Sequence, residues 1–130
     1  MELTEHTADN HHQIRGVEPS RVFVTDQWYE SSLVVGARYL DPRWPVSSLS
    51  GVDQAAIAKL IELGPELIVF GAGERQQFLP REIQLEIIRH GIGVECMTLD
   101  AAARTFNVLM SENRRALAAL IISPADSPGD

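Results

Sequence analysis

The chain has 130 residues, and its 18 acidic against 11 basic side chains give a net charge of -7 at pH 7. Nucleic acids and anionic membrane surfaces bind basic faces, so this balance argues against both as partners. A single cysteine excludes an internal disulfide. No apolar run approaches the roughly 18 residues of a membrane-spanning helix. Length and composition are typical of one soluble globular domain.

The two ends of the chain differ in composition from the middle. Residues 1–12 carry almost no large apolar side chains, and residues 123–130 are polar with two prolines. We expect flexible tails there, flanking a single domain at residues 13–122. The N-terminus lacks the features of a secretory signal or a mitochondrial presequence, which favours a cytoplasmic protein. The histidines of the first tail lack a cysteine or an ordered carboxylate pair, so we expect no metal site.

The first third of the domain is rich in β-branched and aromatic residues. We expect a short strand at residues 14–17 and further strands at residues 21–25 and 28–35. The gap at Asp26–Gln27 has the length of a hairpin turn. Residues 36–46 hold two prolines and predict a loop or an edge segment.

A helix should follow this β-rich part. Ser50, with Asp53 three residues later, has the spacing of a capping box. The expected inward stripe consists of Ile57, Leu60 and Ile61. Gly64 and Pro65 should end the helix, because glycine accepts a left-handed conformation and proline cannot continue. Before this helix, we expect Trp44 to cover the core.

The second half of the chain has the order strand, glycine loop, helix, strand, helix. The two strands are expected at residues 67–70 and 93–97, with a helix from Pro80 to Gly91 between them. Strands joined in this way run parallel, so their carboxyl ends meet at one edge of the sheet. A last helix should begin near Asp100, acting as its N-cap. The expected core positions of the two helices are Ile83, Ile87, Ile88, Ala102, Phe106, Leu109 and Met110.

A final strand is expected at residues 116–122, after Asn113 has closed the last helix.

The glycine loop Gly71-Ala72-Gly73 resembles the start of a dinucleotide-binding fingerprint. The third glycine is replaced by Gln76, and the next helix begins about six residues after Gly73. We therefore expect no nicotinamide or flavin cofactor.

The candidate binding edge lies where the two parallel strands end. Its residues are Gly71, Gly73, Glu74, Arg75, Thr98, Asp100, Arg104 and Asn107. Arg75 and Arg104 could converge on a carboxylate or a phosphate near a helix N-terminus. Alternatively, Asp100 caps the helix while Arg104 and Asn107 tie the strand to it. No histidine falls in this region, and Cys96 lies in an apolar strand as a small hydrophobic residue, so we expect no catalytic centre.

Three separated motifs, residues 65–73, 91–97 and 101–109, resemble the Mth938-like family, as does the segment Trp44-Pro45-Val46. The resemblance covers about residues 14–122. It implies a three-layer α/β fold with a mixed central sheet, flanking helices and an N-terminal β-hairpin layer. Ala72, Ala103 and Phe106 stand where relatives often have threonine, cysteine and tyrosine, which weakens a chemical role for these positions.

The mitochondrial members of this family are complex I assembly factors, which act through protein contacts. Without a presequence, this chain resembles the bacterial members. Our leading hypothesis is a non-enzymatic binding or assembly module that uses the edge of residues 71–77 and 98–107. The alternative is a binder of a small anionic molecule, or an enzyme, that uses the same edge. A pocket there should be concave for a small ligand and flatter for a protein.

Overall fold

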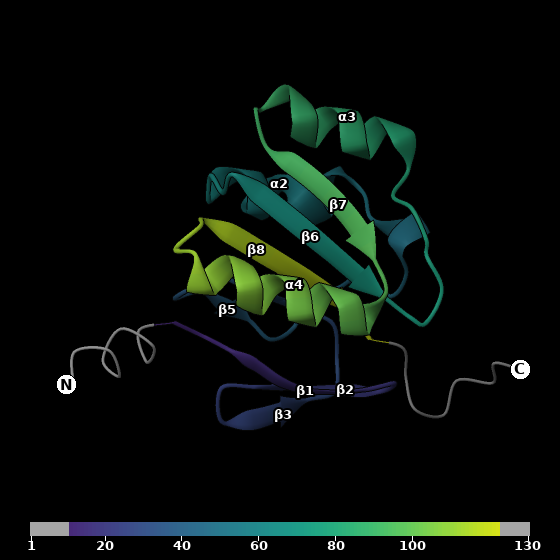
Figure 1. Cartoon of the computed structure of the whole chain (residues 1–130). Helices are drawn as coiled ribbons and strands as arrows, with labels where there is room; N and C mark the ends of the chain where they lie inside the picture. The colour runs from purple at the N-terminus through teal and green to yellow at the C-terminus, as the bar shows by residue number, and fades with distance from the viewer. Residues whose placement is uncertain (1–10, 123–130) are drawn as a thin grey trace, which may run out of the picture.

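The computed structural model describes residues 11–122. The expected tails therefore lie outside the described residues, except for His11 and His12. The described chain is built in three layers around a five-stranded sheet (Figure 1). In order across this sheet, the strands are β5 (Leu40–Asp41), β4 (Leu33–Val35), β8 (Ala116–Ile121), β6 (Leu67–Ala72) and β7 (Gly93–Met97).

The central sheet is mixed, as expected. Strand β6 runs parallel to both β7 and β8, whereas β4 runs antiparallel to β8 and to β5. The sequence of β8 is wholly apolar and all six of its residues are buried, which is typical of a strand covered on both faces. The expected edge segment within residues 36–46 is β5, which lies at one margin of the sheet.

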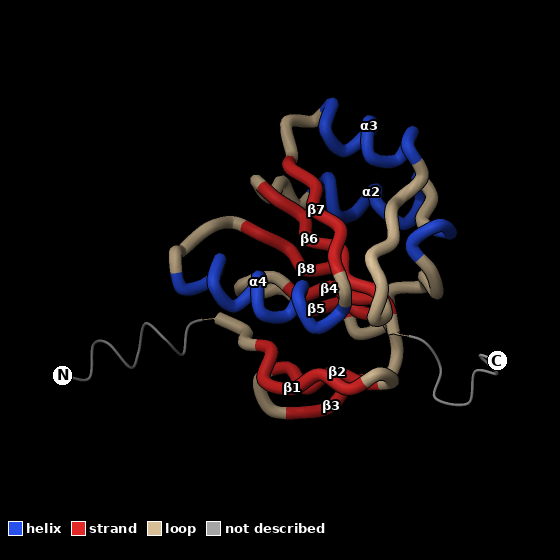
Figure 2. The backbone as a smooth tube through the Cα atoms, turned by 45° about the vertical axis from the view of Figure 1, so that its right-hand side comes forward, coloured by secondary structure: helices blue, strands red, loops and turns tan. Residues whose placement is uncertain are grey.

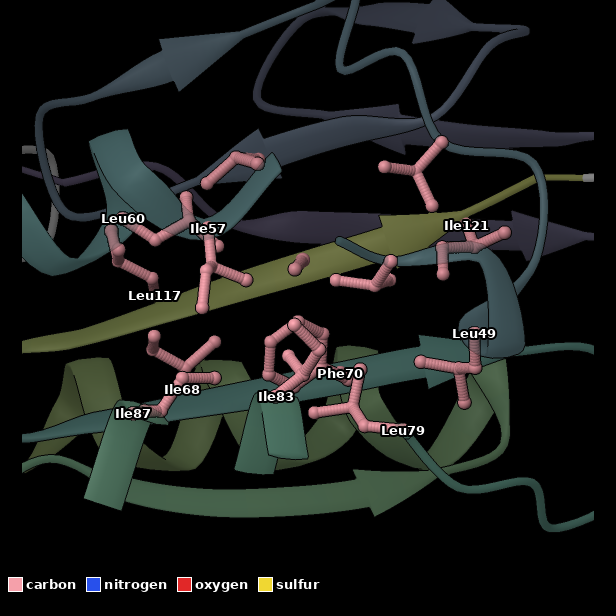
Figure 3. Close-up of a cluster of buried hydrophobic side chains, with 14 of the residues drawn as sticks. Leu49, Ile57, Leu60, Ile68, Phe70, Leu79, Ile83, Ile87, Leu117 and Ile121 are labelled. Atoms are coloured by element: carbon pink, nitrogen blue, oxygen red, sulfur yellow. The ribbon is translucent and has the colours of Figure 1, made fainter. Parts of the chain in front are cut away.

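Two helices, α2 (Gln54–Glu62) and α3 (Arg81–Arg89), cover one face of the sheet together with the short 3-10 helix η1 (Leu49–Gly51). Their buried side chains meet those of β6 and β8 in one apolar cluster (Figure 3). Trp44 is buried in this cluster, and its indole N–H donates to the Ala56 carbonyl at 3.0 Å. It covers the core as expected.

Helix α4 (Leu99–Ser111) packs on the opposite face of the central sheet. A second, antiparallel sheet lies beside it, formed by β1 (Ile14–Glu18), β2 (Arg21–Val24) and β3 (Gln27–Tyr29) (Figure 2). Its inward side chains share an apolar cluster with α4, β4 and β8. The three-layer α/β fold and its N-terminal β layer are thus confirmed.

The strand expected at residues 28–35 is in fact two strands that belong to different sheets. The chain crosses between the sheets at Ser32, whose side chain is buried and accepts a hydrogen bond from the amide of Ile122 at 3.0 Å. The turn between β2 and β3 lies at Thr25-Asp26, one residue earlier than expected, because Val24 pairs with Gln27. Thr25 takes the positive φ of 57° that the turn requires.

The helix starts also differ from expectation. Asp53, not Ser50, caps α2 by accepting a hydrogen bond from the amide of Ala56 at 3.0 Å. Thr98, not Asp100, caps α4 by accepting from the amide of Ala101 at 3.2 Å. Serine, threonine and aspartate all cap well, so neighbouring candidates cannot be separated by residue type alone.

Two further expectations need correction. The glycine loop does not begin at Gly71, because β6 continues through Ala72 and turns only at Gly73, where φ is 63°. Ile88 is 52% exposed, whereas Ile83 and Ile87 are buried. A nine-residue helix on one side of the sheet buries a narrow stripe, and Ile88 lies beside that stripe.

Candidate functional site

The carboxyl ends of β6 and β7 lie side by side, with Gly71 opposite Met97. The loop of residues 73–80 leaves β6 here, and α4 begins directly after β7 (Figure 1). The expected edge is therefore assembled from these two connections. Glu74 and Arg75 are exposed on the loop, and Arg104 is exposed on α4.

Gly71 allows α4 to lie close to the sheet at this edge. A Cβ atom on Gly71 would lie only 2.4 Å from the Cβ of Ala102 and 3.4 Å from the Cα of Leu99. Real Cβ atoms do not approach so closely, so this position requires glycine for its packing. The first of the two glycines thus positions α4, and Gly73 makes the turn.

Three of the first four amide groups of α4 are already hydrogen-bonded. The carbonyl of Gly73 accepts from the amide of Leu99 at 3.0 Å, and Thr98 accepts from Ala101 through its side chain and from Ala102 through its carbonyl. An anion at a helix N-terminus binds to amide groups that lack such partners. This arrangement weighs against anion binding by the start of α4.

The polar side chains of α4 are engaged as well. Arg104 pairs with Asp100 one turn earlier, and both side chains are about two-thirds exposed. Asn107 points to a different place: its carboxamide accepts from the amide of Ile14 at 3.0 Å and donates to the carbonyl of Ile14 at 2.8 Å. Asn107 therefore joins α4 to β1, not to the strand–helix connection.

The loop of residues 73–80 also covers the outer margin of the sheet at β7. Gln76 donates to the carbonyl of Cys96 at 3.0 Å. Burial raises the pKa of the Cys96 thiol above its ordinary value, and a hydrogen bond with the backbone of Leu79 opposes this rise.

Phe78 projects from the loop of residues 73–80 and is 64% exposed, the most exposed large apolar side chain within residues 11–122.

A pocket of about 440 Å³ lies at the opposite end of the sheet, where sequence reasoning did not place a site. It is lined by Arg38, Leu63, Met110, Arg114, Arg115 and Leu117, among others. These residues come from three connections that are far apart in the sequence, and from the end of α4 and the start of β8 beside one of them. In the sequence, the one signal that could have indicated this pocket is the adjacent pair Arg114-Arg115, directly before a strand. A second, smaller hollow lies between α2 and α3.

Within residues 11–122, the histidines, cysteine and carboxylates form no group of three that could hold a metal ion. Nor does any described helix have the length and apolar character needed to cross a membrane.

The fold is that of an Mth938-like α/β domain. The chain belongs to the family described as "protein of unknown function (DUF498/DUF598)", whose model matches residues 14–121. A solved structure of a Xanthomonas campestris protein is 35% identical, covers 96% of this chain and 95% of its own, and superposes with a TM-score of 0.81. A Bordetella pertussis Mth938-like domain, at 22% identity, covers 88% of this chain and 89% of its own with a TM-score of 0.75, and supports the fold alone.

Among curated proteins, the chain is 40% identical over 87 residues to a zebrafish protein, "NADH dehydrogenase [ubiquinone] 1 alpha subcomplex assembly factor 3" (Danio rerio). The match covers 65% of this chain and 50% of that protein. The chain thus spans about half the length of this relative. The resemblance to the Mth938-like family and to the assembly factors is confirmed at the level of the family.

Proposed function

We propose that this chain is a protein-binding module that assists the assembly of a multi-subunit complex. Its contact surface would be the loop of residues 73–78 together with the first two turns of α4. The zebrafish relative, named as an assembly factor, supports a role of this kind. The name of this relative supports the class of function. The exposed residues of this chain support the location of the surface.

The exposed phenyl ring of Phe78 is the observation that carries the proposal. A partner that covers this ring would gain the free energy of burying its apolar area, and the polar residues Gln76 and Gln77 precede it on the loop. Aromatic and arginine side chains are the residues that most often dominate protein interfaces. Phe78 and Arg75 supply one of each within four residues.

Binding to a partner can be tested with a matched pair of variants. Phe78→Ser removes the proposed anchor, and Leu85→Ser removes another exposed apolar side chain, on α3. In pull-downs from native lysate, Phe78→Ser and Arg75→Ala should lose one set of co-purifying subunits that Leu85→Ser retains. If all three variants retain the same proteins as the wild type, the interface lies elsewhere.

The alternative, an anion site at the same edge, has one observation in its favour. Within residues 11–122, Arg75 has no hydrogen-bond or ion-pair partner. A chemical-shift titration with phosphate, nucleotides and small carboxylates tests this alternative. An anion site requires shifts at Arg75 and at Arg104 that Arg75→Ala abolishes, and their absence removes this alternative.

A further inference from the structure

The pocket of about 440 Å³ lies at the end of the sheet where β6 and β8 begin, opposite the loop of residues 73–80. Its walls are the connection between β4 and β5, the turn that ends α2, and the connection between α4 and β8. In Figure 1, the ends of α2 and α4 lie toward the left of the molecule and the 73–80 loop lies toward the right. The pocket is therefore separate from the proposed protein-contact surface.

Hydrogen bonds fix the wall formed by the α4–β8 connection. The carboxylate of Glu66 accepts from Arg114 Nε at 3.0 Å and from the amide of Arg115 at 3.1 Å. The guanidinium of Arg115 donates through Nη1 to the carbonyl of Gly64, the residue that ends α2 with a φ of 66°. The two arginines thus hold the helix end and the strand start together, so the pocket is largely preformed.

Arginine side chains gather around the pocket within a strongly acidic chain. Of its lining residues within 11–122, three are arginines and none is acidic. Glu66 and Glu112 both pair with Arg114, and Arg115 faces the partly negative carboxyl end of α2. Arg115 uses one of its five N–H donors in the bond to Gly64. The charge of Arg115 suits a ligand with one negative charge better than one with two.

The other half of the lining is apolar. Leu63 is 39% exposed at the rim, whereas Met110 and Leu117 are buried in the floor. The pocket volume lies within the range of small-molecule sites, in which an apolar lining holds the body of a ligand and a few polar groups fix its orientation.

We propose that this pocket binds a small monocarboxylate with an apolar tail, with its carboxylate at Arg115 and its tail over Leu63 and Leu117. The arginine fork matches a carboxylate in a two-bond geometry. A free inorganic anion should bind poorly. Against the apolar floor it would lose part of its hydration shell, and the apolar side chains offer no hydrogen bonds in return.

The proposal is tested on the full chain by chemical-shift titration with octanoate as the probe. Added octanoate should change the amide chemical shifts of Gly64, Arg115 and Leu117 until they reach saturation. The amide chemical shifts of residues 73–78 should stay unchanged. Octanol has the same tail without the charge, and acetate has the charge without the tail. Octanol should bind at least about tenfold more weakly, since a hydrogen bond to a charged group is worth about one power of ten. Acetate should also bind at least about tenfold more weakly, because it loses the burial of the methylene groups of the tail.

Two pairs of variants separate a site from general effects of charge. Arg115→Gln should weaken octanoate binding about tenfold, whereas Arg81→Gln on α3, outside the pocket lining and with the same change in net charge, should leave it unchanged. Leu63→Asp places a carboxylate at the rim and should also weaken binding. Leu85→Asp makes the same change at a similarly exposed position on α3, outside the pocket lining, and is the control for stability.

Three results would overturn the proposal. One is that octanol binds as tightly as octanoate, because the arginines would then play no part. Another is that octyl phosphate binds at least about tenfold more tightly than octanoate, which would assign the pocket to a phosphate monoester. The last is that the folded Leu63→Asp variant binds octanoate as the wild type does. None of these results bears on the pull-down at Phe78.

Discussion

Asn107 on α4 and Ile14 on β1 are joined by two hydrogen bonds, since the carboxamide of Asn107 both accepts from and donates to the backbone of Ile14. These residues are 93 positions apart in the sequence. The side chain thus acts as an extra strand partner for β1 and fixes the small sheet against α4. It also satisfies two backbone groups that alanine would leave without a partner.

Asn107→Ala should therefore lower the free energy of unfolding by about 2 kcal/mol, the usual cost of removing partners from two partly buried polar groups. Arg104→Ala, one turn away, should change it by less than about 0.5 kcal/mol, because its ion pair with Asp100 is exposed. Urea denaturation measures both values. Equal losses in the two variants would show that the pair with Ile14 contributes nothing specific.

The location of this pair shows what the sequence could predict. The apolar runs of β6 and β8 and the glycines and prolines between elements led to the α/β order and the parallel strands. The helical spacing of Arg104 and Asn107 predicts that they share a face, and this predicts Asn107 at the candidate edge. Helical spacing gives the face of a helix but not the element that packs against it, and β1 is far away in the sequence.

The arginine-lined pocket cannot be predicted from the sequence for a similar reason. Arg38, Gly64 and Arg115 belong to three connections, and each one alone resembles an ordinary turn. Only the sheet order, with β4 beside β8 and β8 beside β6, brings these connections together. The edge at β6 and β7 could be predicted because consecutive parallel strands determine its position.

The contact of Gly71 with Ala102 leads to a second stability prediction. Gly71→Ala should destabilise the fold by about 1–3 kcal/mol, because the new methyl group overlaps the Cβ of Ala102. Adding Ala102→Gly should recover part of this loss, since it removes the overlapping atom. A double-mutant cycle in urea measures this coupling. If the double mutant shows the simple sum of the two losses, α4 is not positioned by this contact.

The carboxyl group of Glu66 should make stability depend on acid pH. The hydrogen bond from Arg114, with a second from the amide of Arg115, lowers its pKa below the ordinary 4.5. The unfolded chain then binds more protons than the native chain between the two pKa values. The stabilising contribution is thus complete above about pH 4.5 and is lost as the pH falls through the native pKa.

Glu66→Gln removes this dependence, so the difference in stability between wild type and variant should shrink on acidification. Urea unfolding at about pH 7 and about pH 3 measures it. Glu62→Gln, on the outer face of α2 beside Lys59, is a matched control for the loss of one carboxylate. A difference between wild type and Glu66→Gln that is constant with pH would contradict the assigned role of Arg114.

Cys96 should be a slow nucleophile in the folded protein. Burial raises the pKa of its thiol above the ordinary 9.0, with the Glu95 carboxylate adding to the rise and the Leu79 backbone opposing it. Only the thiolate reacts, so alkylation by iodoacetamide near neutral pH should be slower in the native state than in urea, and the native rate should still be rising above pH 9.0. Gln76→Ala, which releases the loop from the carbonyl of Cys96, should increase the native rate. A native rate that equals the unfolded one would mean that the loop of residues 73–80 does not protect the margin of the sheet.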